Sequence, residues 1–295
     1  MKKSAQTALL AVFMMLAVAA LIALLAGQGL PRYAGLSLVL WSLLIAVAVQ
    51  WLVFVHAYYY QTEQFYDLTG AATNIGIVVF GFSLSAATPR DYLLLACIVI
   101  WALRLGAFLF WRVRVDGGDT RFASIKPDFY RFLLTWTLQG MWIFLILLCT
   151  LLAMATENPK PLGLMTLFGF ACWLLGMVVE SIADVQKRLF RAEPSNAGQF
   201  IHHGLWAWSR HPNYFGEILL WLGIAIIALP VLSGWMYLGL LSPLFVILLL
   251  SKVSGIPLLE ASADQRWGNN VRYQHYKAQT PVLIPRRPKL REKTD

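Results

Sequence analysis

Long apolar runs separated by short polar segments dominate this chain. A helix that crosses the hydrocarbon core of a bilayer needs about 20 apolar residues, and most of the runs approach that length. No polar segment between them is long enough for a separate soluble domain. The pattern therefore predicts an all-α polytopic membrane helix bundle with about 7–8 transmembrane helices, forming a single integral membrane domain over 1–295. The eight runs are 5–26, 36–58, 71–87, 92–111, 132–155, 161–179, 214–232 and 235–250.

The distribution of basic residues predicts the orientation of this bundle. If the N-terminus is cytoplasmic and the eight runs alternate in direction, 20 of the 24 lysines and arginines fall on the cytoplasmic side. Arg32, Arg90 and Lys160 fall on the other side, and Arg104 lies within a run. This asymmetry follows the positive-inside rule, so both termini are expected to be cytoplasmic.

Composition narrows the classes of function further. The chain is 59% hydrophobic and only 13% charged, and its net charge of +9 resides mostly in loops and tail. Contact with membrane lipids, and not with nucleic acid, is the expected use of that charge. The three cysteines, Cys97, Cys149 and Cys172, lie inside apolar runs without metal-type spacing, so no metal is expected. The sequence contains no Walker loop, dinucleotide glycine fingerprint, zinc pattern or serine-hydrolase elbow.

The segment 209–217, Ser-Arg-His-Pro-Asn-Tyr-Phe-Gly-Glu, is the densest polar cluster in the chain. Proline suits the first turn of a helix, so a helix is predicted to begin at Pro212. The N–H groups of that turn, with Arg210 and His211 beside them, suit an anionic group such as a phosphate. Asn213 and Glu217 then share one helix face, with Tyr214 beside them. The alternative is an anchor whose Arg, His and Tyr lie among lipid headgroups.

A second polar pattern follows the sixth run. Glu180, Asp184, Arg188 and Arg191 are spaced i, i+4, i+8 and i+11, which places them on one stripe of a helix that extends into the cytoplasm. A carboxylate followed by arginines can hold a ribose hydroxyl and phosphates, because Arg is a bidentate phosphate ligand. A helix end stabilised by ion pairs remains the alternative.

Carboxyl groups mark the start of the third run. Glu63 and Asp67 are one helical turn apart, with Tyr66 between them. Acids at the mouth of an apolar bundle keep their protons more readily, so one of these groups can act as a proton donor. A capping cluster is the alternative.

Two further segments carry polar and aromatic side chains. Residues 119–122 and Arg131 are expected to add cofactor contacts. The tail around 265–285 is expected to form either a lid over the ligand or a segment that lies on the membrane surface.

Residues 180–217, together with Ile218-Leu219-Leu220-Trp221, resemble the C-terminal region of the steroid 5α-reductase family. The resemblance is greatest to its bacterial branch, DUF1295, extends over about 60–285 and includes the block 65–70. It divides the domain into N-terminal spans (1–58) and a reductase-like region (59–295) with the cofactor site in 180–285.

The resemblance implies an NADPH-dependent reductase of a carbon–carbon double bond in a steroid-like or other lipid enone, an integral protein of a bacterial inner membrane. Its pattern assigns NADPH contacts to Asp184, Arg188, Arg191, Asn213 and Glu217, with Tyr214, Arg210 and His211 against the site. The catalytic Glu and Tyr of the family have no clear counterparts here; Glu63 or Asp67 and Tyr66 are the candidates.

Two other classes of function remain open. Isoprenylcysteine and phospholipid methyltransferases carry a similar Arg-His-Pro-x-Tyr-x-Gly segment and use S-adenosylmethionine. This methyl donor has no phosphate, so the stripe containing Arg188 and Arg191 favours NADPH. The third class is a non-catalytic lipid binder. The expected partners are membrane lipids and a lipid-soluble small-molecule substrate.

Overall fold

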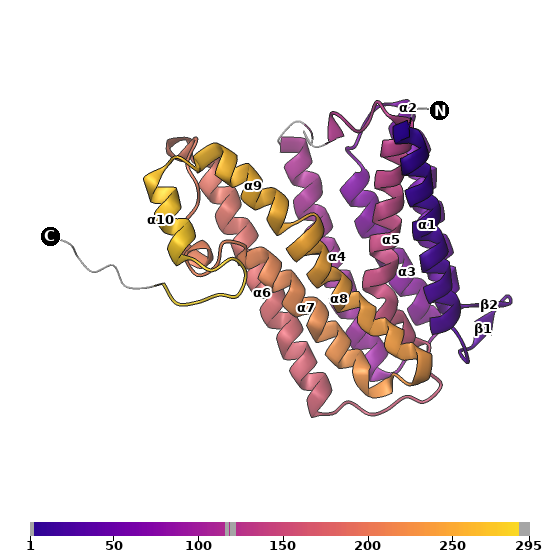
Figure 1. Ribbon diagram of the computed structural model, residues 1–295. Helices are drawn as coiled ribbons and strands as arrows, with labels where there is room; N and C mark the ends of the chain where they lie inside the picture. Colours follow the sequence, from indigo (N-terminus) through magenta and orange to yellow (C-terminus); the bar gives the residue numbers. More distant parts are fainter. Residues whose placement is uncertain (1–2, 116–117, 119–121, 289–295) are drawn as a thin grey trace. The chain divides into compact units, whose positions relative to one another are not determined.

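The computed structural model describes residues 3–115, 118 and 122–288, and its regular structure is almost entirely helical (Figure 1). Residues 119–121, for which cofactor contacts are expected, lie outside the described residues. The α-helices are α1 (Lys3–Ala26), α2 (Leu38–Tyr59), α3 (Tyr66–Ser83), α4 (Pro89–Val115), α5 (Phe129–Met154), α6 (Leu164–Ala192), α7 (Pro212–Ala228), α8 (Leu241–Leu248), α9 (Ile256–Trp267) and α10 (Val271–Gln279). The 3₁₀ segments are η2 (Pro194–Asn196), η3 (Gly204–Ala207), η4 (Leu229–Val231) and η5 (Gly234–Leu240), and the π-helix is η6 (Leu249–Val253). The strands β1 (Arg32–Tyr33) and β2 (Leu36–Ser37) form a small antiparallel hairpin between α1 and α2.

The chain divides into two compact units. Unit 1 comprises Met1–Leu167 and Ile224–Ser242, and unit 2 comprises Phe168–Gly223 and Pro243–Asp295. Helices α1 to α5 belong entirely to unit 1 and α9 and α10 to unit 2, whereas α6, α7 and α8 contribute residues to both.

Unit 1 is organised around α5. Of the apolar stretch of α5, 83% is buried, compared with 39% for α2, so α5 is the central helix of this unit. Helices α1, α2 and α3 pack against it, and α4 packs against α3 (Figure 1). An aromatic cluster that includes Phe54, Phe122, Phe132 and Trp136 closes one end of this packing.

Seven helical segments among the described residues are long and apolar enough to cross a membrane, within the predicted range, and they identify an integral membrane protein. The helix formed at the third apolar run, α3, is not one of them, although it packs against α2, α4 and α5 inside unit 1. Two termini on one side of a bilayer require an even number of crossings. The cytoplasmic placement of both termini therefore needs α3 as an eighth span and stays a prediction.

Two helix boundaries confirm the sequence prediction and one segment differs from it. Helix α7 begins at Pro212, and α6 runs without a break to Ala192, a length of about 43 Å against a hydrocarbon core of about 30 Å. The run 235–250 is not one α-helix but η5, α8 and η6 in succession. The 3₁₀ segment η5 packs tightly on α5, where a Cβ added at Gly239 would lie 3.1 Å from the Cα of Cys149.

A buried arginine holds the beginning of α4 in unit 1. The side chain of Arg90 is 2% exposed. Its guanidinium donates to the carbonyls of Ile227 (3.1 Å), Lys160 (2.8 Å) and Pro161 (3.2 Å), and to the hydroxyl of Thr166 (3.2 Å). One side chain thereby joins the start of α4, the loop before α6 and the end of α7.

Candidate functional site

Glycines set the distance between α6 and α7 in unit 2. A Cβ added at Gly216 would lie 2.6 Å from both the amide nitrogen of Glu180 and the carbonyl oxygen of Gly176. A Cβ at Gly223 would meet the carbonyl of Gly169 and the amide of Trp173 at the same distance. Side chains cannot be accommodated at these separations, so the two antiparallel helices approach backbone to backbone, as small residues allow in membrane bundles.

This glycine seam brings the two predicted cofactor segments together. At its end, the side-chain amide of Asn213, in the first turn of α7, donates a hydrogen bond to the Asp184 carboxylate of α6 (3.3 Å). Both side chains are half-buried, and Glu180, one turn before Asp184, is buried against Gly216. The stripe on α6 and the polar segment at the start of α7 are therefore neighbours, as the interpretation of the sequence required.

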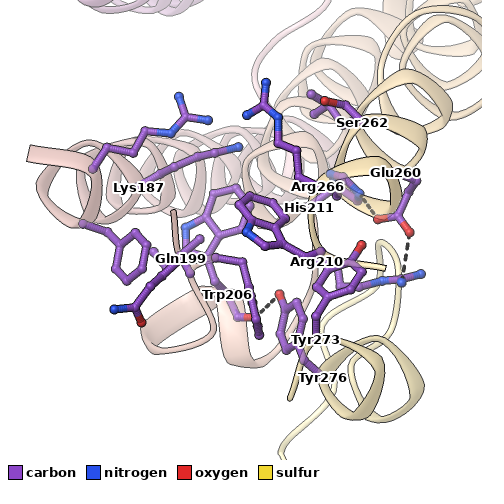
Figure 2. Close-up of a pocket in the computed structure, with 17 residues that line it drawn as sticks. Lys187, Gln199, Trp206, Arg210, His211, Glu260, Ser262, Arg266, Tyr273 and Tyr276 are labelled. Carbon is purple, nitrogen blue, oxygen red and sulfur yellow. Dashed lines mark hydrogen bonds and ion pairs between the residues drawn. The ribbon is translucent and has the colours of Figure 1, made fainter. Parts of the chain in front are cut away.

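A cavity of about 140 Å³ opens at the same end of unit 2 (Figure 2). Its walls come from the end of α6, the segment 199–211, α9 and α10. Arg191, Arg210 and His211 are the predicted cofactor residues that line it. Aromatic rings form much of the remaining wall, and the cavity is lined by Lys187, Phe190, Arg191, Gln199, Phe200, Ile201, Trp206, Arg210, His211, Leu259, Glu260, Ser262, Ala263, Arg266, Trp267, Tyr273 and Tyr276.

Glu260 of α9 organises one side of the cavity. Its carboxylate forms an ion pair with the guanidinium of Arg210 (Nη1 to Oε2, 2.9 Å) and accepts from Nε2 of His211 (2.8 Å) (Figure 2). Because a carboxylate only accepts, Nε2 of His211 carries a proton, a tautomer assigned from this contact. Nδ1 of His211 is buried and has no hydrogen-bond partner within the described residues. The ring of Tyr214 stacks on His211 at 5.7 Å.

The tail after α9 folds back onto this site. The backbone N–H of Arg210 donates to the carbonyl of Pro281 (2.9 Å), and the hydroxyl of Ser209 donates to the carbonyl of Leu283 (2.8 Å). The phenol of Tyr276 donates to the carbonyl of Trp206 (2.7 Å) (Figure 2). Of the two alternatives for the tail, these contacts favour the lid, since the tail packs against residues beside the cavity.

Two phenols belong to this cover, the buried Tyr273 and the half-buried Tyr276. Burial raises the pKa of Tyr273 to about 12, and the nearby carboxylates of Asp264 and Glu260 act in the same direction. Burial also raises the pKa of Tyr276. Both phenols therefore stay neutral hydrogen-bond donors at physiological pH.

The cavity wall carries a surplus of positive charge. Lysine and arginine contribute Lys187, Arg191, Arg210 and Arg266, whereas Glu260 is the one acidic residue that the described part of the chain contributes to this wall. The ammonium of Lys187 also lies over the ring of Trp206, 4.6 Å from its centroid. An anionic ligand with a flat, aromatic portion suits such a surface.

The other predicted cofactor residues lie outside the cavity wall. Arg188 is exposed on α6, and Glu217 is half-buried on α7, one turn beyond Asn213. Lys187, Trp206 and Glu260 line the cavity but were not found from the sequence. The sequence does hold a signal for Glu260. This acidic residue directly follows the apolar residues 256–259, and a carboxylate in such a position needs a cationic partner.

The predicted proton donors lie in unit 1. Glu63 is 8% exposed and forms an ion pair with the ammonium of Lys126, a residue that the sequence did not single out. This pair favours the carboxylate over the neutral acid. The Tyr66 phenol donates to the carbonyl of Thr135 (3.1 Å), and Asp67 is half-buried in the first turn of α3.

Comparison with known proteins places the chain in a family. The family model described as "Protein of unknown function (DUF1295)" matches residues 53–280, more than half of the sequence. The chain belongs to this family. It is also 29% identical over 119 residues to the rat 3-oxo-5-alpha-steroid 4-dehydrogenase 1, a match that covers 40% of each protein. The predicted kinship with steroid 5α-reductases is thereby confirmed.

Other relatives extend this picture. An uncharacterized protein of Schizosaccharomyces pombe is 23% identical over 190 residues, covering 55% of each chain. A probable O-methyltransferase of Ustilaginoidea virens is 30% identical over 77 residues, covering 26% of this chain and 25% of the relative. The chain thus spans about half or less of the length of these curated relatives. No solved structure matches the sequence.

Proposed function

We propose that this member of the DUF1295 family is an NADPH-dependent reductase of a carbon–carbon double bond in a steroid-like or other lipid enone. The observation that carries the proposal is the junction of α6 and α7. The glycine seam that brings Asp184 to Asn213 also places Arg191 and Arg210, from the ends of the same segments, in the wall of one positively charged cavity. Kinship with the steroid 4-dehydrogenase supports the reaction class.

The residues fit a phosphorylated nucleotide. Arg191 and Arg266 suit phosphate oxygens, and the Asp184 carboxylate suits a ribose hydroxyl. The aromatic walls suit a base. At about 140 Å³ the cavity is smaller than the 300–1,000 Å³ of pockets that enclose whole ligands, so it holds one phosphate-bearing part of the cofactor.

When bound, NADPH supplies the hydride for the β-carbon of an enone. The protein then has to meet the negative charge that grows on the carbonyl oxygen with a positioned donor. Glu63, Tyr66 and Asp67 remain the proposed donors. Glu63 is paired with Lys126, so it can donate a proton only after this pair opens or after the lysine transfers its own proton to the carboxylate.

A bacterial inner membrane is the proposed location.

A membrane methyltransferase that uses S-adenosylmethionine is the second candidate, because a probable O-methyltransferase is among the relatives. The surplus of arginine and lysine around the cavity argues against it, since this methyl donor carries no phosphate.

A paired activity assay tests the proposal. The protein in lipid nanodiscs is incubated with a panel of sterol and isoprenoid enones, once with NADPH and once with S-adenosylmethionine, and the products are identified by mass spectrometry. Reduction of a member of the panel, with a gain of two hydrogens per NADPH oxidised, is the expected result. Products that gain a methyl group only from S-adenosylmethionine, without any NADPH oxidation, contradict the proposal.

A further inference from the structure

A carboxylate lies in the wall of a cavity whose other charged groups favour anions. Glu260 of α9 lines the cavity of unit 2 together with four basic residues of the described chain, and its side chain is 18% exposed. A negative charge at this place repels the phosphate groups of the proposed cofactor. The carboxylate therefore lowers the affinity of the site for NADPH unless its contacts compensate for the repulsion.

The two oxygens of this carboxylate contact two different side chains. Oε1 of Glu260 accepts from Nε2 of His211 (2.8 Å), and Oε2 forms the ion pair with Nη1 of Arg210 (2.9 Å) (Figure 2). Both partners are nearly buried, since 6% of the His211 side chain and 10% of the Arg210 side chain are exposed. One carboxylate thus holds an imidazole and a guanidinium that both line the cavity.

The backbone of the same two residues is held by other contacts. The N–H of Arg210 donates to the carbonyl of Pro281 in the tail (2.9 Å). The N–H of His211 donates to the hydroxyl of Ser209 (3.1 Å), which itself donates to the tail. None of these bonds involves the carboxylate of α9. This carboxylate therefore fixes the direction of the side chains, whereas the course of the chain before α7 does not depend on it.

Helix α10 supports the carboxylate from a further side. Nζ of Lys277 lies 3.9 Å from Oε2 of Glu260 and donates to both carboxylate oxygens of Asp264 (2.6 and 2.7 Å). Asp264 in turn accepts from the phenol of Tyr273 (3.2 Å). Lys277 and Asp264 are not among the residues that line the cavity. Of the two carboxylates in this network, Glu260 is the one that reaches the cavity wall.

We propose that Glu260 is a positioning residue for the cofactor site. It fixes the guanidinium of Arg210 and the tautomer of His211, and it acts through these two side chains without touching the cofactor itself. The affinity gained from the fixed side chains exceeds the affinity lost to the negative charge of the carboxylate. This role rests on the proposed binding of NADPH, whereas the tautomer of His211 can be measured without any cofactor.

The position of the proton on His211 tests the hold of the carboxylate directly. The full chain is labelled with ¹⁵N-histidine and studied by NMR in lipid nanodiscs at neutral pH without cofactor. The signal of His211, one of five histidines, is identified by its loss in His211→Asn. A proton on Nε2 is expected, because a carboxylate can only accept. A neutral ring with its proton on Nδ1 would overturn the proposal, whether or not the protein binds NADPH.

A substitution separates positioning from simple electrostatics. Glu260→Gln keeps the size of the side chain, but an amide has one oxygen, so either Arg210 or His211 loses its acceptor. NADPH affinity is expected to fall about tenfold, although the variant removes a negative charge from the wall of an anion site. Electrostatics alone predicts tighter binding. Unchanged or higher NADPH affinity in Glu260→Gln therefore contradicts the proposal.

A matched control isolates the effect of the position. Glu157→Gln removes the same charge from an exposed loop and should leave NADPH affinity unchanged. The backbone contacts of 209–211 with the tail remain in Glu260→Gln, so this variant is expected to fold. A wild-type protein that binds no NADPH would contradict the proposed function. A wild-type protein that binds NADPH no more tightly than Glu260→Gln would contradict the positioning role alone.

Discussion

The amide of Asn213 donates to the carboxylate of Asp184 across 3.3 Å, and this contact joins the two polar segments that stand out in the sequence. The residues are 29 positions apart, yet the glycine seam between α6 and α7 brings their helices close enough to bond. In the proposed function this pair orients the Asp184 carboxylate toward a ribose hydroxyl.

Removing either member of this pair should weaken cofactor binding without unfolding the protein. For Asp184→Ala and for Asn213→Ala we expect NADPH affinity to fall about tenfold, since a hydrogen bond to a charged group contributes about 1.5–3 kcal/mol. Titration of the purified variants with NADPH measures the loss. Asn158→Ala, in an exposed loop, is the control. Unchanged affinity in both variants would mean that the assigned site is wrong.

The glycine seam should be intolerant of added volume. Gly216→Ala places a methyl group 2.6 Å from the backbone of α6, so we expect destabilisation of about 1–3 kcal/mol and weaker NADPH binding. Thermal unfolding in detergent measures the first effect. Gly76→Ala is the matched control, because that glycine is also helical but its Cβ would meet no atom within 4 Å. This control should be neutral or slightly stabilising.

Arg90 should be among the positions on which the stability of unit 1 depends most. Arg90→Lys retains the charge but cannot reach all four acceptors, so buried carbonyls lose their donors, and a loss of about 3 kcal/mol in unfolding free energy is expected. Arg32→Lys, at an exposed position, should have little effect. If the two variants melt at the same temperature, the buried network contributes nothing to stability.

The raised pKa of the Tyr273 phenol predicts that the free energy of unfolding falls at alkaline pH. An unfolded tyrosine loses its proton near pH 10, whereas the folded-state pKa of Tyr273 is raised to about 12. Between these values the unfolded chain releases a proton that the folded chain keeps, so stability falls as pH rises through this window and is unaffected below it. Unfolding curves across this range should show the decline, and Tyr273→Phe should lessen it. Tyr59→Phe, which removes an exposed phenol, is the control.

Removal of the lysine partner tests Glu63 as a proton source. Lys126→Met breaks the ion pair that favours the carboxylate, so Glu63 should keep its proton to higher pH. The alkaline limb of the pH–rate profile for enone reduction should therefore move to higher pH, while Glu63→Gln should abolish turnover and leave NADPH binding intact. Full activity in Glu63→Gln would exclude this residue as the donor.

The sequence predicted the helices and the two polar segments because both depend on local patterns. The apolar runs identified the membrane helices, and Pro212 marked the start of α7. The sequence could not reveal Glu260 as the partner of Arg210 and His211, since that contact joins positions about fifty residues apart through tertiary packing. Lys126 was overlooked for the same reason, as one of five basic residues in a loop. The apolar run 235–250 also gave no sign that its first part is the 3₁₀ segment η5, which packs closely on α5 at Gly239.

The central claim is that the cavity at the ends of α6 and α7 holds a phosphorylated redox cofactor. The most direct test is the thermal stability of the purified protein in detergent with NADPH and, separately, with S-adenosylmethionine. Binding of NADPH at a hundred times its dissociation constant should stabilise the folded state by about 2.7 kcal/mol, and Arg191→Met should reduce that gain. Stabilisation by S-adenosylmethionine alone, with none from NADPH, would contradict the account.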